Sequence, residues 1–302
     1  MPKPRSSSSH TIARRVAPFA PIALALLMSR AVLGPPSGAP GGTTKTADLA
    51  PVTCGDVQDF EDCHTRFPAG CSQGSGTPNY DAYLNLLKNQ LIAPASAAPV
   101  KFFTAKTDYD QLNKQIPAQL GSKNHADFKD ALDAAGETQV YGVIGYLYYI
   151  KPEGAESSNC QLPKDPPNYE EVDYHIGIGF DKDLAGQLLG KKNPAPHDLS
   201  SNSVIVEMTP HFRARFESGK WTVNGLNNAL GRQVKVVGQL MVDNDHNVKS
   251  QNCALATAAS ELASCWRMSV WELHPVISFL VCNKEPCTQN SPDWVELDHL
   301  TH

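Results

Sequence analysis

The feature that most constrains the fold of this chain is a change in hydrophobic period near residue 138. Beyond it, apolar side chains alternate with polar or small ones, a period of two that is typical of β-strands. The predicted strands are residues 139–150, 172–180, 203–209, 233–243 and 268–281. Residues 222–230, which Gly231 closes, predict a helix between the third and fourth strands.

The segment before residue 138 has the period of helices. In one stretch, apolar residues recur at intervals of three and four, and Thr77-Pro78 supplies a helix start. These residues are Tyr80, Tyr83, Leu84, Leu87 and Leu91. A second helix is predicted to begin at Thr107 or Asp108, and a third to span residues 125–135 and end at Gly136.

The order of these elements predicts an architecture. Five strands with a helix between the third and fourth match an OB-fold barrel, and a β-sandwich is the competing architecture. We therefore expect an α+β chain with a helical, disulfide-tied region at residues 54–136. An OB-fold-like five-stranded β-barrel is expected at residues 137–287, followed by a C-terminal tail at residues 288–302.

The first 31 residues have the composition of a secretory signal peptide. Basic residues without any acidic residue precede an apolar run at residues 16–29, which is shorter than the roughly 17–25 residues of a membrane-spanning helix. An uncleaved N-terminal anchor is the alternative. Residues 32–53, rich in Gly, Pro, Thr and Ala, predict a flexible spacer. We expect export to the periplasm or the cell exterior, with no transmembrane segment after the leader.

Removal of the signal peptide would make the net charge of the remaining chain more negative. The full chain has a formal net charge of −5, and residues 1–31 contain five basic and no acidic residues, so the remainder carries −10. Proteins that bind the phosphate backbone of a nucleic acid need an excess of Lys and Arg. A nucleic-acid partner is therefore not expected, and the predicted partner is an extracytoplasmic ligand of unknown identity.

All the cysteines lie beyond the predicted leader. They are Cys54, Cys63, Cys71, Cys160, Cys253, Cys265, Cys282 and Cys287. An even number of cysteines in an oxidising compartment indicates disulfide bonds, and the absence of a C-x-x-C pair argues against a zinc-thiolate site. Short spacing favours Cys282 with Cys287 and allows Cys253 with Cys265, whereas the full connectivity stays open.

Four sequence strings in the second half of the chain resemble strings found in other proteins. They are D-Y-H-I at residues 173–176, V-I-V-E-M-T-P at 204–210, G-R-Q-V-K-V-V-G-Q-L-M-V-D-N-D-H at 231–246 and W-E-L-H-P-V at 271–276. In these strings the chain resembles a group of uncharacterised exported bacterial proteins, over roughly residues 138–282. The resemblance implies that the four strings belong to one domain, and it implies no activity.

The same strings hold the polar residues that could carry chemistry. Side chains alternate along a strand, so the acid and the histidine of each D-x-H or E-x-H pair point to one face. Imidazoles and carboxylates are ligands of zinc, manganese and iron, and a spare carboxylate can deprotonate a bound water. The candidate metal ligands are Asp173, His175, His246 and His274, and the candidate catalytic bases are Glu207 and Glu272.

These residues also have a purely structural interpretation. Polar pairs on strands often form cross-strand contacts, and a sheet face exposed to water carries polar residues in any case. The spacing H-E-x-x-H is absent. The favoured function is a non-catalytic module that binds a glycan, a peptide or another extracytoplasmic ligand. The alternative is a metal-dependent hydrolase of the phosphodiesterase type, with a divalent transition metal such as zinc.

Overall fold

The structure of this chain, a computed structural model, describes residues 52–72, 81–92, 94, 98–162, 171–191, 197–216 and 221–300. The predicted signal peptide and almost all of the predicted spacer lie outside these ranges. Within the described residues, no helix is both long enough and apolar enough to cross a membrane.

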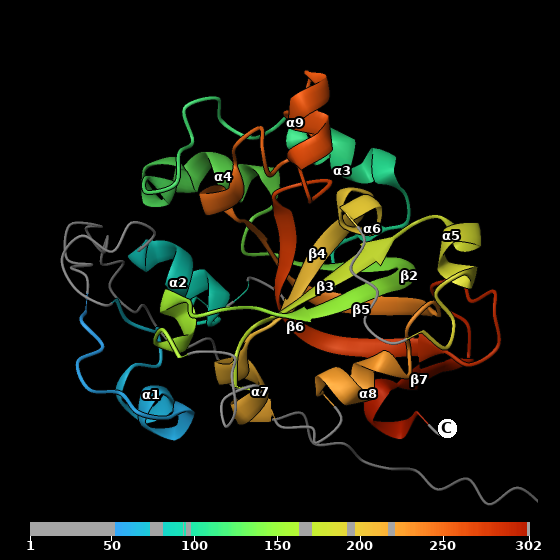
Figure 1. Cartoon of the computed structure of the whole chain (residues 1–302), viewed down its shortest axis with the longest axis horizontal. Helices are drawn as coiled ribbons and strands as arrows, with labels where there is room; N and C mark the ends of the chain where they lie inside the picture. The colour runs from blue at the N-terminus through green and yellow to red at the C-terminus, as the bar shows by residue number, and fades with distance from the viewer. Residues whose placement is uncertain are drawn as a thin grey trace, which may run out of the picture. The chain divides into compact units, whose positions relative to one another are not determined.

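A mixed sheet lies at the centre of the described part (Figure 1). In these residues its seven strands are β1 (Phe102–Phe103), β2 (Val140–Pro152), β3 (Tyr174–Gly179), β4 (Ser203–Met208), β5 (Gln233–Val242), β6 (Trp271–Cys282) and β7 (Trp294–Glu296). The pairings run β2–β3–β4–β6–β5 and return to β2, so five strands form a ring. The β4–β6 pairing is parallel, whereas the other pairings in the ring are antiparallel. These five are the strands that alternation predicts.

Helices are distributed between and around the strands (Figure 1). The α-helices are α1 (Phe60–Arg66), α2 (Ala82–Lys88), α3 (Lys106–Asn113), α4 (Lys129–Ala135), α5 (Lys182–Gly186), α6 (His197–Ser201), α7 (Pro210–Phe216), α8 (Val223–Asn227) and α9 (Ala259–Ser264). Short 3-10 turns are η2 (His125–Phe128), η3 (Ser157–Asn159), η5 (Asn244–His246) and η6 (Leu297–His299). The α+β class is confirmed.

The predicted helices appear with local adjustments. Asp81 caps α2, because its carboxylate accepts the backbone N–H groups of Tyr83 and Leu84. The predicted start at Thr77-Pro78 lies outside the described residues. The segment predicted as a third helix is a 3-10 turn followed by α4, which ends at Gly136 with φ 112°, a left-handed conformation that favours glycine.

One face of the ring strands packs into the main apolar core. Ile176, Val206 and Leu273 from three neighbouring strands are fully buried there. Burial of such a side chain contributes roughly 1.5–3 kcal/mol. On the opposite face, α2 packs Leu84 and Leu87 against Met241 of β5, so a helix from the N-terminal region covers part of the sheet.

Disulfide bonds pair all eight cysteines. The pairs are Cys54–Cys71, Cys63–Cys160, Cys253–Cys265 and Cys282–Cys287. The pairing of Cys282 with Cys287, which sequence spacing favours, is confirmed, and so is that of Cys253 with Cys265, which spacing allows. Cys63–Cys160 joins α1 to the segment after β2 across 97 residues, a separation that spacing alone does not reveal.

A buried histidine ties η2 to the end of β5. His125 Nε2 lies 2.9 Å from Glu137 Oε2, and its Nδ1 lies 2.7 Å from Asn244 Oδ1. The other oxygen of Glu137 accepts the backbone N–H of Val242 at 2.8 Å. Burial disfavours the charged imidazole, but the hydrogen bond and charge of Glu137 outweigh burial and raise the pKa of His125 above its usual 6.5.

This raised pKa predicts a stability that depends on pH. The stabilisation by protonated His125 is fully present below pH 6.5, and it is lost as the pH rises through the folded-state pKa. Between pH 6 and 9, the free energy of unfolding should therefore fall more steeply for the native chain than for His125→Gln. Urea unfolding at each pH measures both slopes. Equal slopes would contradict the role of His125.

Candidate metal centre

The polar face of β3, β4 and β6 brings acidic residues and histidines from three strands together. His175 of β3 stands opposite Glu207 of β4 in the antiparallel register. Val206 stands beside Leu273 in the parallel pairing of β4 with β6, so the residues that follow them, Glu207 and His274, are neighbours. The sheet register thus places Glu207 between two histidines.

Glu207 contacts both of these histidines. Its Oε1 lies 2.6 Å from His175 Nε2, and its Oε2 lies 3.0 Å from His274 Nδ1. His175 also contacts Glu153 through Nδ1, at 2.8 Å. Glu207 and His274 are fully buried, and His175 is 5% exposed. This face is therefore covered, contrary to the structural interpretation in which its polar residues face water.

Asp173, at the entrance to β3, joins the same group. Its Oδ2 accepts a hydrogen bond from Ser158 Oγ of η3 at 3.0 Å, and its Oδ1 has no hydrogen-bond partner. Ligand atoms of Asp173, Glu207 and His274 all lie within 4.8 Å of one another. Two carboxylates and an imidazole at that separation could hold a divalent metal ion.

A second acidic group adjoins the first but is neutralised by an arginine. Glu207, Asp243 and Glu272 also offer oxygens within 4.8 Å of one another. The buried guanidinium of Arg267 donates a hydrogen bond through Nη1 to Asp243 Oδ2 at 3.0 Å and another to Glu272 Oε1. Since Arg267 occupies these two carboxylates, the group around Asp173 is the better candidate for a cation.

His246 lies at the edge of this network. Its Nδ1 contacts Asp243, and its ring meets the Trp266 ring edge-on, with centroids 5.0 Å apart. Trp266 also stacks on His175 at 5.9 Å. The His246 side chain is 28% exposed, and His246 belongs to none of the donor groups found in the described residues. The structure therefore brings Asp173 and His274 together, with His175 beside them, but leaves His246 apart.

Several buried atoms in the network lack hydrogen bonds. Both oxygens of Glu207, Oε2 of Glu272 and both ring nitrogens of His274 have no hydrogen-bond partner, although some lie within ion-pair distance. Leaving a buried polar group without a hydrogen bond costs about 1–3 kcal/mol, and native proteins contain few such groups. These atoms form ion pairs between carboxylates and imidazoles, and a bound cation would take the place of the proton that an imidazole carries.

Burial and mutual charge shift the pKa values of the network. Burial opposes the charge on His274, but Glu207 outweighs burial and raises its pKa to about 9. Burial, followed by the charge of Glu156, raises the pKa of Asp173 to about 6. Burial and the charge of Glu207 raise the pKa of Glu272 to about 7. A metal ion that binds His274 near neutral pH must therefore displace a proton.

Sequence reasoning missed charged residues that complete the network. Lys88 of α2 is 6% exposed, and its Nζ lies 3.3 Å from Glu156 Oε2. One signal for Lys88 was present, because it lies four residues after Leu84 on the apolar stripe of its helix. Glu153 lies directly after β2 and Arg267 lies in the loop before β6. Neither position belongs to a hydrophobic period that could have drawn attention to it.

A cavity of about 620 Å³ lies elsewhere, at the far end of β3, and shares no residue with the network. It is lined by Lys106, Tyr148, Phe180, Asp181, Lys182, Asp183, Leu184, Asn202 and Met268. Its lining combines charged and polar side chains with apolar and aromatic ones.

In comparisons with known proteins, no family model, no curated protein and no solved structure matches this chain. The assignment of function therefore rests on the geometry of the site.

Proposed function

We propose that this chain is an exported binding protein whose ligand is a divalent transition-metal ion such as zinc. The observation that carries the proposal is the convergence of Asp173, Glu207 and His274, which are fully buried and whose ligand atoms lie within 4.8 Å of one another. Glu272 Oε2, 3.5 Å from His274 Nδ1, is the nearest candidate for a fourth ligand. Because an imidazole accompanies the carboxylates, zinc, manganese or iron suits the group better than calcium or magnesium.

Burial favours binding over catalysis. A hydrolytic metal needs a coordination position that water and substrate can reach. Asp173, Glu207 and His274 are fully buried, and α2 covers part of their face. A metal-dependent hydrolase with Glu272 as its base stays the alternative, and it requires this cover to open. In the binding function, the ion holds the loop at Asp173 against β4 and β6.

The position of the site in the fold supports the proposal. We propose that the five-stranded ring is an OB-fold-like barrel, supported by its strand order, its one parallel pairing and the helix α8 before β5. OB-folds bind ligands on their second and third strands, between the first–second and fourth–fifth loops. In this chain those strands are β3 and β4, which carry His175 and Glu207. Export is supported by the four disulfide bonds.

The cavity supports a second candidate ligand. Its volume of about 620 Å³ lies within the usual range of ligand pockets, about 300–1,000 Å³, and its lining combines Lys106 and Asn202 with Tyr148 and Phe180. A glycan or a short peptide would suit this lining. Screening such ligands against the native chain and Asn202→Ala tests the candidate. Ligands that bind both proteins equally, or no binding at all, would contradict it.

Equilibrium dialysis with zinc tests the metal proposal. After treatment with chelator, the oxidised native chain should bind about one zinc ion, and binding should release protons at pH 7, because His274 is protonated there with a pKa of about 9. Below pH 9 the affinity should rise with pH. His274→Ala should lose this ion, while His246→Ala, an edge variant, should keep it. Zinc that stays in His274→Ala would exclude this site.

A further inference from the structure

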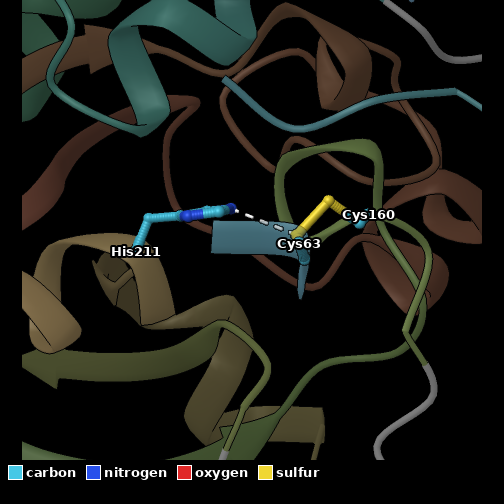
Figure 2. A group of neighbouring side chains, drawn as sticks. All are labelled: Cys63, Cys160 and His211. Carbon is cyan, nitrogen blue, oxygen red and sulfur yellow. Dashed lines mark hydrogen bonds between the residues drawn. A yellow bond between two sulfur atoms is a disulfide. The ribbon is translucent and has the colours of Figure 1, made fainter. Parts of the chain in front are cut away.

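A second group of metal-binding side chains surrounds the Cys63–Cys160 disulfide. His211 of α7 points its Nε2 at Cys63 Sγ, 3.5 Å away (Figure 2). Potential ligand atoms of Cys63, Cys160 and His211 lie within 4.8 Å of one another, and all three residues are buried. Two sulfurs and one imidazole nitrogen are thus gathered from three distant segments of the chain.

A second histidine allows His211 to present either a proton or a lone pair to the sulfur. His64 Nδ1 lies 2.9 Å from His211 Nδ1, so one of the two nitrogens donates and the other accepts. If His64 donates, His211 carries its proton on Nε2 and directs it at the sulfur. If His211 donates, its Nε2 carries the lone pair and can act as a metal ligand. Phe60 packs against both imidazoles and holds them together.

No other disulfide in the described residues has such a neighbour. Only the Cys63–Cys160 pair belongs to a donor group there, although all eight cysteines are described. The arrangement is therefore a property of this disulfide and not of disulfides in this chain generally. A metal-binding thiolate pair also normally needs a third or fourth ligand, which His211 supplies.

We propose that reduction of the Cys63–Cys160 disulfide creates a zinc site formed by the two thiolates and His211 Nε2. A dithiol reductant breaks the S–S bond, gives two protons and two electrons to the cysteines, and becomes a disulfide itself. Zinc then displaces the two thiol protons. Thiolates and imidazole are the ligands that structural zinc sites use, so the reduced site selects zinc over magnesium or calcium.

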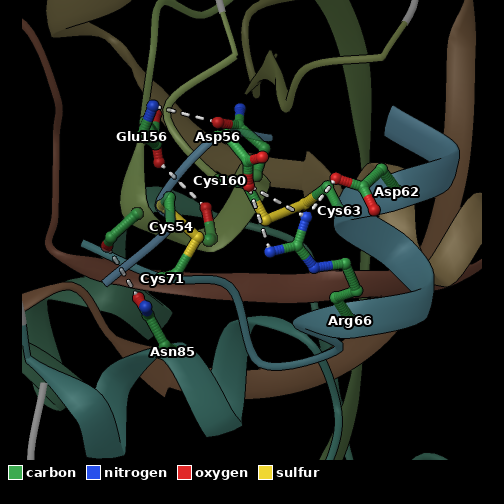
Figure 3. The surroundings of a disulfide bond; sticks show 12 residues. Cys54, Asp56, Asp62, Cys63, Arg66, Cys71, Asn85, Glu156 and Cys160 are labelled. Atoms are coloured by element: carbon green, nitrogen blue, oxygen red, sulfur yellow. Dashed lines mark hydrogen bonds and ion pairs between the residues drawn. A yellow bond between two sulfur atoms is a disulfide. The ribbon is translucent and has the colours of Figure 1, made fainter. Parts of the chain in front are cut away.

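The surrounding backbone keeps the donors close after the disulfide opens. The backbone N–H of Cys71 donates to the Ser157 carbonyl at 2.8 Å, which joins the loop after α1 to the segment that carries Cys160. Gly70 approaches Ser157 so closely that a Cβ atom would overlap it. Beside the disulfide, Arg66 of α1 bonds both Asp56 and Asp62 (Figure 3). These contacts do not depend on the Cys63–Cys160 bond.

Zinc binding by the oxidised and the reduced full chain tests the proposal. The reduced chain should bind about one zinc ion more than the oxidised chain, and this extra ion should protect Cys63 and Cys160 from alkylation, as read by mass spectrometry. Protection needs no variant and is therefore independent of whether a variant folds. Equal zinc binding in both states, or protection of other cysteines only, would overturn the proposal.

Variants identify the ligands and separate this site from the one at Asp173. His211→Ala should weaken binding of the extra ion by about tenfold or more, while Cys282→Ser/Cys287→Ser, a matched disulfide removal, should leave it unchanged. His274→Ala should also keep the extra ion, so failure of one site is distinguishable from failure of the other. Unchanged affinity in His211→Ala would contradict the ligand assignment.

Discussion

Replacing Arg267 with alanine is expected to lower the free energy of unfolding by about 3–5 kcal/mol. Arg267 is fully buried and hydrogen-bonded to Asp243 and Glu272, which are also fully buried. Without the guanidinium, two carboxylates stay in a poorly hydrated interior with less opposing charge. Chemical denaturation of the oxidised, metal-free chain measures the loss.

Arg66 provides the matched control. It bonds two carboxylates in the same manner, Asp56 and Asp62, but at the surface. Solvent screens exposed ion pairs and they contribute little, so Arg66→Ala should leave the free energy of unfolding almost unchanged. Equal effects of Arg66→Ala and Arg267→Ala would show that the buried network does not stabilise the fold.

Zinc is expected to raise the free energy of unfolding of the oxidised chain by about 2.7 kcal/mol at a free concentration of 100 times the dissociation constant. The ion would bind Asp173, Glu207 and His274 only when three separate segments are folded together, so it binds the native state selectively. Thermal or denaturant unfolding over a zinc series measures this increase.

Two variants make the zinc experiment specific. In Glu207→Gln, a neutral amide replaces the carboxylate that lies between His175 and His274, so stabilisation by zinc should disappear. In His246→Ala, the edge histidine is removed and stabilisation should persist. A zinc effect that survives Glu207→Gln would assign the ion to another place on the protein.

Alternation predicted the ring strands because each has one face in an apolar core. The strand predicted at 233–243 is Gln233–Val242, and the one predicted at 203–209 is Ser203–Met208. In contrast, β1 and β7 contain two and three residues, which is too short for a period to appear. Their pairing with β2 and β6 depends on contacts between distant segments, which local sequence does not encode.

The grouping of the site residues was only partly predictable. Alternation correctly placed Glu272 and His274 on a common face, since that depends on strand geometry alone. It did not reveal that Glu207 would lie between His175 and His274, because this position depends on the register of β4 with two partners. Nor did it reveal the cover over this face, which α2 supplies from a remote part of the chain.

Anomalous X-ray scattering at the zinc absorption edge, from crystals of the oxidised chain grown with zinc, tests the central claim most directly. We predict a peak about 2.0–2.2 Å from carboxylate oxygens of Asp173 and Glu207 and from a ring nitrogen of His274. Zinc found only at surface side chains, with no peak at this group, would contradict the account.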